Sequence, residues 1–200
     1  MRKIKPLAHA FILSALIGCH APMSRKVIVM GRGKIVVGNN KIDMKDGTGY
    51  AEETVDIEGT KPTQWQVTTS TGKKTVNIPE EKGVYILNLK TDTIIGSRQT
   101  LGNDINNSKD ITQEELKIKI DSLTLLTKGD NVHLGGRNYF IIPGQIIKVS
   151  PNIEAKVFGP FTLISHKLEM DSGNNIPEIY KFYTNTEMRQ LIGKFVKMTK

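Results

Sequence analysis

The sequence predicts a mainly β, α+β fold, with an antiparallel β-sandwich-like domain over residues 26–100 and a smaller α+β domain with two helices over residues 112–200. Three observations predict it. Short β-branched and aromatic runs alternate with turn sequences in the first half. A polar stretch, residues 101–111, then interrupts this pattern and is predicted to be a linker or loop. Beyond it, two segments begin with helix-capping residues.

The expected strands of the first domain are short, and glycine-containing turns separate them. β-branched and aromatic side chains favour strands because they pack well on a pleated surface, and Gly, Asn and Asp between them favour turns. Trp65 lies within one of these strands, and we expect it to anchor the core. The expected strands are residues 26–30, 34–37, 41–44, 53–58, 64–70, 74–78 and 84–89.

The segment that begins at Thr112 is predicted to be a helix. Thr112 and Glu115 have the spacing of a capping box, in which each side chain accepts a hydrogen bond from the other residue's backbone N–H. Gly129 is placed to end the helix. The run LKIKID within it alternates with period two, as a strand does, so a strand is the alternative.

The last part of the chain combines further expected strands with a second helix. Pro143 and Gly144 fit the central positions of a type II turn between two apolar runs. Thr184 and Glu187 repeat the capping-box spacing, and the residues that follow form one apolar stripe at helical spacing. The stripe consists of Met188, Leu191, Ile192, Phe195 and Val196.

The chain begins with a pattern typical of a secretory signal peptide. Three basic residues, Arg2, Lys3 and Lys5, precede a mostly apolar run over residues 7–17, and small residues lead to Cys19. A membrane-spanning helix needs about 20 apolar residues, so this run is too short for a permanent span. A charged start, a short apolar run and a small residue before the cleavage site predict export.

Residues 16–19, with the sequence Leu-Ile-Gly-Cys, resemble the lipobox of bacterial lipoprotein signal peptides. The resemblance implies a signal peptide over residues 1–18, cleavage before Cys19 and a diacylglycerol group on the Cys19 sulfur. In that family the new amino terminus is often acylated as well. Residues 19–25 would then be a lipidated tether. The alternatives are an ordinary signal peptide whose cysteine is coincidental and a buried N-terminal strand.

The residue after this cysteine bears on location. In Gram-negative lipoproteins an aspartate there favours retention in the inner membrane, and His20 occupies the position here. The resemblance therefore implies the outer membrane, with the protein facing the periplasm. Cys19 is the only cysteine, so it cannot form an intramolecular disulfide, and lipidation would consume its thiol. Each buried methylene contributes about 0.8 kcal/mol, so two or three acyl chains anchor stably.

The charge of the chain limits the classes of partner. The formal net charge is +8, and cleavage before Cys19 would leave +5, because it removes three basic residues and no acidic one. The basic residues are scattered, with no polybasic tract. A modest excess suits an anionic membrane surface or an acidic partner, and it also simply maintains solubility. No nucleic-acid partner is expected, because basic and aromatic residues do not interleave as in RNA-binding proteins.

The linker carries a weak calcium pattern. Side-chain oxygens recur at positions 1, 3, 5, 7, 9 and 12 of a stretch that starts at Asp104, as in an EF-hand loop. Two features count against calcium: Lys109 replaces the glycine that the loop needs, and a strand-like segment precedes it. A polar linker that ends in a capping box explains the same pattern. The candidate ligands are Asp104, Asn106, Ser108, Asp110, Thr112 and Glu115.

No catalytic motif stands out, so the sequence favours a non-enzymatic protein without a cofactor. His20, His133 and His166 are too far apart for a sequence-local metal site, and the run TSTGKKT lacks the first glycine of a phosphate-binding loop, which leaves a hairpin turn. We therefore expect a lipid-anchored envelope protein that acts as a binding or assembly module, with the membrane and an envelope protein as partners. The alternatives are an envelope hydrolase with carboxylates brought together from distant loops, and a calcium-stabilised structural protein.

Overall fold

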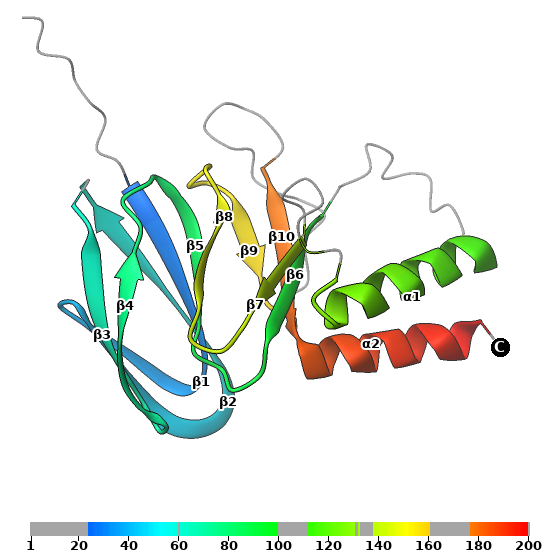
Figure 1. Ribbon diagram of the computed structural model, residues 1–200, viewed down its shortest axis with the longest axis horizontal. Coiled ribbons are helices and arrows are strands. Elements are labelled where there is room, and N and C mark those ends of the chain that lie inside the picture. The colour runs from blue at the N-terminus through cyan, green and yellow to red at the C-terminus, as the bar shows by residue number, and fades with distance from the viewer. Residues whose placement is uncertain are drawn as a thin grey trace, which may run out of the picture.

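The computed structural model describes residues 24–59, 61–99, 112–130, 132, 138–160 and 177–199. Within these residues the chain forms two β-sheets and two helices, and the helices lie together on one side of the sheets (Figure 1). The mainly β, α+β class that the sequence predicts is confirmed.

The larger sheet is mixed, so the expectation of purely antiparallel pairing is wrong. Its six strands have the order β4-β3-β2-β1-β5-β8. β1 pairs with β5 in parallel, and β2 pairs with β3 in parallel, whereas the other neighbours are antiparallel. The strands are β1 (Ser24–Gly38), β2 (Lys41–Glu58), β3 (Thr63–Thr69), β4 (Gly72–Ile78), β5 (Gly83–Asn88) and β8 (Ile146–Ser150).

The smaller sheet draws strands from both halves of the chain. Its order is β7-β6-β10-β9, and only β10 and β9 are parallel. β6 precedes residue 100 and lies in this sheet, whereas β8 follows residue 111 and lies at the edge of the larger one. The strands are β6 (Ile94–Gln99), β7 (Asn138–Ile141), β9 (Lys156–Phe158) and β10 (Ile179–Thr184).

β1 and β2 are long, bent strands rather than the four short strands that the sequence predicts. Their antiparallel register shifts between Arg32 and Lys34. Gly33 lies at this point with a φ of 86°, a conformation that side chains with a Cβ rarely adopt. Glycine-rich segments lie opposite each other here, so both strands bend together instead of ending. The glycines therefore produce a bulge where local sequence rules predict turns.

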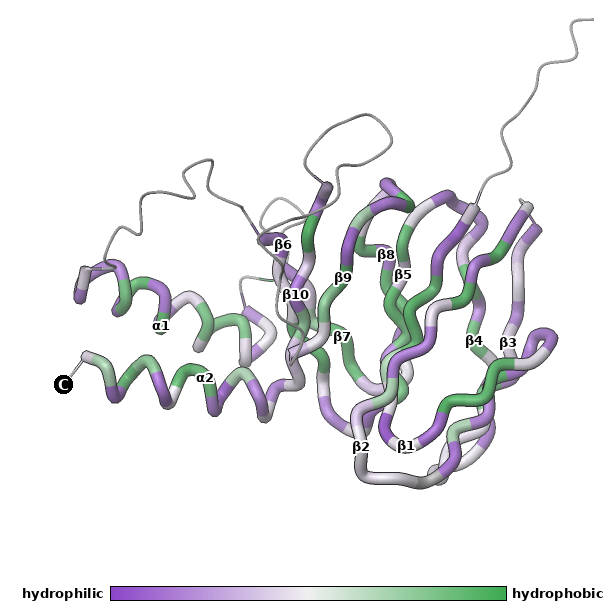
Figure 2. Tube along the Cα trace, turned by 180° about the vertical axis from the view of Figure 1, so that it is seen from behind, coloured by the Kyte–Doolittle hydropathy of each residue, from purple (hydrophilic) through white to green (hydrophobic). Residues whose placement is uncertain are grey.

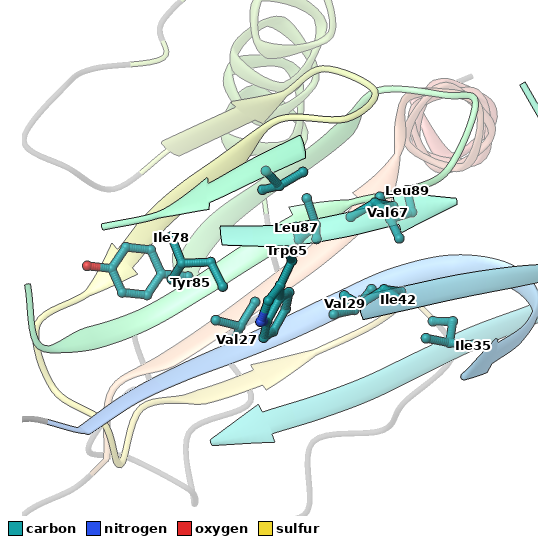
Figure 3. Packing of buried hydrophobic residues seen from close by; sticks show 11 residues of the cluster. Val27, Val29, Ile35, Ile42, Trp65, Val67, Ile78, Tyr85, Leu87 and Leu89 are labelled. Atoms are coloured by element: carbon teal, nitrogen blue, oxygen red, sulfur yellow. The ribbon is translucent and has the colours of Figure 1, made fainter. Parts of the chain in front are cut away.

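The bend folds the larger sheet over its own inner face, which encloses the first of three apolar clusters (Figure 3). Trp65 is 3% exposed in this cluster, so its expected role as a core anchor is confirmed. Side chains alternate along β1, with Val27 and Val29 in this cluster and Ile28 and Met30 in the second, between the two sheets. Figure 2 shows hydrophobic residues running along β5, which is buried throughout.

The third cluster lies between the smaller sheet and two antiparallel helices, α1 (Gln113–Thr127) and α2 (Asn185–Met198). Both predicted capping boxes are formed, at Thr112 and at Thr184. The helix predicted for the first segment is therefore confirmed, and its strand alternative is wrong. Met188, Leu191 and Ile192 of the predicted stripe pack in this cluster, whereas Val196 at the far end of the stripe is exposed. In the described part of the chain, neither helix is long and apolar enough to cross a membrane.

Candidate functional site

Two cavities in the described part of the chain lie side by side, because Lys90 lines both of them. The larger, which we call the lysine pocket, has a volume of about 400 Å³ and is lined by Met44 and residues 69–74, 89–91 and 143–144. The smaller, which we call the side pocket, has a volume of about 190 Å³. It is lined by Arg32, Thr48, Tyr50, Lys90 and Glu187.

One wall of the lysine pocket is the β3–β4 hairpin. The strands pair from Thr63 opposite Ile78 to Thr69 opposite Gly72, so the hairpin turn that the sequence predicts here is confirmed. The tip exposes the hydroxyl groups of residues 69–71 beside two consecutive lysines. Hydroxyl groups both donate and accept hydrogen bonds, whereas an ammonium only donates.

The opposite wall is the predicted turn at Pro143 and Gly144. The Gln145 N–H donates to the Ile142 carbonyl at 3.1 Å, and Gly144 has a φ of 80°, so the type II turn is confirmed. The turn does not form a hairpin, because β7 and β8 belong to different sheets. It instead carries the chain from one sheet to the other and brings the Gly144 carbonyl to the pocket.

Lys74 joins the two walls. Its ammonium donates to the Gly144 carbonyl at 2.7 Å, and a methyl group at Gly144 would lie only 1.7 Å from that nitrogen. Burial lowers the pKa of Lys74 below its ordinary value. Among the described residues the Lys74 ammonium has no carboxylate partner, and the Gly144 carbonyl occupies one of its three donors. Two donors of a half-buried cation therefore remain for a ligand.

Asn88, at the end of β5, fixes the inner wall. Its side chain is completely buried, and its amide donates to the Ile141 carbonyl at 2.9 Å and to the Asp92 carbonyl at 3.0 Å. Its side-chain oxygen accepts from the Lys90 N–H at 2.9 Å. Because buried amides cost free energy unless all their groups are paired, this arrangement rigidly positions residues 89–92.

Lys90 lines both cavities. The residue is 6% exposed, and its ammonium lies 4.3 Å from the centre of the Tyr50 ring in a cation–π contact. Burial, and after it the nearby Arg32 charge, lower the pKa of Lys90, and the carboxylates of Glu187, Glu52 and Asp92 oppose this shift without reversing it. Lys90 therefore adds a second buried cation beside Lys74.

Tyr50 forms the other side of this contact. Its hydroxyl donates to the Glu52 carboxylate and lies against Gly159, where a methyl group would be 2.5 Å from the hydroxyl oxygen. Burial of the hydroxyl, and then its hydrogen bond to Glu52, raise the pKa of Tyr50 above its ordinary value. Tyr50 therefore stays a neutral phenol and orients Glu52 rather than acting as an acid or base.

A separate polar cluster links the two sheets. Ser150 donates to the Glu178 carboxylate at 2.6 Å, and Tyr180 donates to the same oxygen at 3.0 Å. Arg98 lies 3.4 Å from the other oxygen. The Glu178 carboxylate is thus held by three side chains from three strands or their ends, which is the arrangement of a structural link.

The site residues that the sequence suggests lie mostly outside the described residues. These are Cys19 and the linker candidates Asp104, Asn106, Ser108 and Asp110; His20, His133 and His166 lie outside the described residues as well. Thr112 and Glu115 are described and bind each other: Glu115 Oε2 accepts from the Thr112 N–H at 2.9 Å and from its hydroxyl at 3.1 Å. In the described ranges, no three His, Cys, Asp or Glu residues are grouped so that they could hold a metal ion.

Sequence reasoning missed the lysine pocket. Lys73 and Lys74 stand in the TSTGKKT run, which reads correctly as a hairpin turn, and Lys90 directly follows an apolar strand. Nothing local distinguishes these lysines from solvent-exposed ones. A hydrolase would need two carboxylates in one cavity. The described lining of the two cavities contains a single carboxylate, that of Glu187 in the side pocket.

Comparison of the chain with protein-family models, curated proteins and solved structures finds no match. Residue chemistry and geometry therefore carry the functional argument. The strongest feature is the half-buried, uncompensated Lys74 ammonium at the centre of a pocket with hydroxyl groups on its walls.

Proposed function

We propose that the chain is a lipid-anchored protein of the bacterial cell envelope whose folded part is a non-enzymatic binding module. Its lysine pocket holds an oxyanion of the ligand. The observation that carries this proposal is the Lys74 ammonium, which lacks a carboxylate partner among the described residues and retains two donors. Charge-assisted hydrogen bonds of this kind are shorter and stronger than neutral ones.

The anchor follows from the lipobox resemblance at Cys19. β1 begins at Ser24, five positions after this cysteine. Five extended residues span at most about 17 Å, so the folded part would lie close to the lipid surface. His20 after the cysteine favours the outer membrane, with the module facing the periplasm. A binding module held there meets the anionic components of the envelope at high local concentration.

Cys19→Ala tests the anchor. We expect the variant either to move from the membrane fraction to the soluble fraction or to accumulate at the size of the unprocessed precursor, because no thiol is left to accept the lipid. Cell fractionation and mass spectrometry measure both effects, and Pro22→Ala is the control that keeps the cysteine. A Cys19→Ala protein that remains with the membrane at the mature size would show that the lipid attachment is wrongly assigned.

Lys74→Gln tests the pocket. The probe is galacturonate, a small sugar that carries one carboxylate. We expect the substitution to weaken its binding about tenfold or more, because a hydrogen bond to a charged group contributes about 1.5–3 kcal/mol and 1.4 kcal/mol corresponds to tenfold. Chemical-shift titration by NMR measures the dissociation constant. Lys82→Gln is the matched control, since Lys82 is exposed and lines neither cavity. Equal loss in both variants would contradict a specific oxyanion site.

A further inference from the structure

We infer that the lysine pocket and the side pocket are neighbouring subsites for one acidic oligosaccharide, with a sugar carboxylate in the lysine pocket and the hydroxyl groups of the next sugar in the side pocket. This inference rests on the proposed function and adds the class of ligand. It depends on four features: the adjacency of the cavities, the charge of the lysine pocket, the apolar lining of that pocket, and the mixed hydrogen-bonding groups of the side pocket.

The cavities are adjacent because Lys90 lines both of them. Lys90 is nearly buried and its ammonium lies over the Tyr50 ring, so this shared wall is held in place. The lysine pocket falls within the range of about 300–1,000 Å³ that is typical of small-ligand sites, whereas the side pocket, at about 190 Å³, is smaller than this range. A ligand that filled both would have to be an extended chain of units.

The charge of the lysine pocket favours an anionic ligand. Its described lining holds three lysines, Lys73, Lys74 and Lys90, and no carboxylate. Asp43 does not neutralise Lys73, because its carboxylate is paired with Lys41 at 2.8 Å. A sugar carboxylate beside the Lys74 ammonium would supply the negative charge that the lining lacks.

The apolar lining complements a sugar ring. Met44, Leu89 and Pro143 line the lysine pocket together with the lysines and hydroxyl groups. The ring faces of a sugar present C–H groups, while its edge presents hydroxyl groups that donate and accept hydrogen bonds. Apolar walls with a small number of convergent polar groups are the usual means of fixing such a ligand.

The side pocket offers both donors and acceptors. Arg32 is exposed, and its guanidinium supplies up to five donors. Glu187 faces the same cavity and uses its Oε2 atom to accept from the Thr184 N–H at 2.7 Å, which leaves Oε1 for a ligand hydroxyl. Thr48 adds a hydroxyl group, whereas the Tyr50 hydroxyl already donates to Glu52. Because two cations, Arg32 and Lys90, line this cavity with one carboxylate, it suits the hydroxyl edge of the next sugar and tolerates the carboxylate of that sugar.

The test compares ligands of one and three units on the purified mature protein. We expect trigalacturonate to bind at least about tenfold more tightly than galacturonate, and neutral cellotriose to bind far more weakly than trigalacturonate. Arg32→Gln should remove most of the gain from chain length, so that the ratio of the galacturonate dissociation constant to the trigalacturonate dissociation constant falls. Lys74→Gln should weaken both acidic ligands. Calorimetric titration gives the constants, and an unchanged melting temperature confirms that each variant is folded.

The outcomes separate this inference from the proposed function. If galacturonate and trigalacturonate bound with equal affinity, and if Arg32→Gln changed neither dissociation constant, the extended site would be overturned. The oxyanion pocket would stay in place. Tighter binding of glucose 6-phosphate than of galacturonate would overturn the carboxylate assignment alone. If cellotriose bound as well as trigalacturonate, or if Lys74→Gln changed neither acidic ligand, both the inference and the proposed oxyanion pocket would be overturned.

Discussion

Trp65→Ala is expected to lower the free energy of unfolding by about 3–5 kcal/mol, the range for removal of a buried tryptophan or phenylalanine side chain. The indole is 3% exposed and lies among side chains from β1, β2 and β5 inside the curl of the larger sheet (Figure 3). Removing it deletes apolar contacts and leaves a cavity that surrounding strands can fill only in part.

The loss should be large because the indole bridges the two sides of the curl. Trp65 extends from β3 toward Val27 of β1 and lies beside Leu87 of β5 in Figure 3. β3 is bonded to β2 over three residue pairs only, Lys41–Asp43 with Gln66–Thr68. The β3–β4 hairpin is therefore held against the rest of the fold chiefly by this apolar cluster.

Urea denaturation followed by circular dichroism measures the change. Gln64→Ala is the matched control on the same strand, since its side chain is exposed and such substitutions change stability by less than about 0.5 kcal/mol. A loss below about 1 kcal/mol for Trp65→Ala would contradict the packed curl. Because the same hairpin carries Lys74, galacturonate affinity should fall as well, whereas Trp65→Phe should largely retain it.

The helices could be predicted from the sequence because their signals are local. Thr112 with Glu115, and Thr184 with Glu187, each interact within one turn, so the spacing alone specifies both caps. The pairing of the strands, by contrast, depends on contacts between residues that are far apart in the sequence. β8 pairs with β5 across about 60 residues, and no local pattern indicates that β6 leaves the sheet of β5 or that β8 leaves the sheet of β7 and β9.

The site could not be predicted for the same reason. Its walls come from the β3–β4 hairpin, the end of β5 and the turn before β8, and only the fold brings them together. Lys74 is recognisable as special only through its hydrogen bond to Gly144, a residue 70 positions away. The calcium pattern is the opposite case, since it is local and visible in the sequence, but four of its six candidate ligands lie outside the described residues.

Gly96→Ala is expected to destabilise the protein by about 1–3 kcal/mol or more, because it overfills a packed site. Gly96 of β6 lies directly opposite Phe182 of β10 in the antiparallel register. A methyl group at Gly96 would lie 2.1 Å from Cδ1 of the Phe182 ring, well inside contact distance. Phe182 is 1% exposed and packs against Tyr139 with ring centres 5.8 Å apart, so the ring has no free space to enter.

A double-mutant cycle isolates this contact. Phe182→Ala alone should cost about 3–5 kcal/mol. In that background Gly96→Ala should cost little or even stabilise, because the clash is gone and alanine in an element interior is favoured over glycine by roughly 0.5–1 kcal/mol. Thermal or urea unfolding of the four proteins gives the coupling energy. Simple additivity would show that Phe182 is not what requires glycine at this position.

The same cycle connects the core to the site. β10 ends at Thr184, which caps α2 directly, and the first turn of α2 carries Glu187 into the side pocket. If the Phe182 ring over Gly96 fixes β10, then Gly96→Ala should weaken trigalacturonate more than galacturonate, because it shifts Glu187 and not Lys74. If Gly96→Ala destabilised the protein but left the ratio of the trigalacturonate and galacturonate dissociation constants unchanged, α2 would be positioned by its contacts with α1 instead.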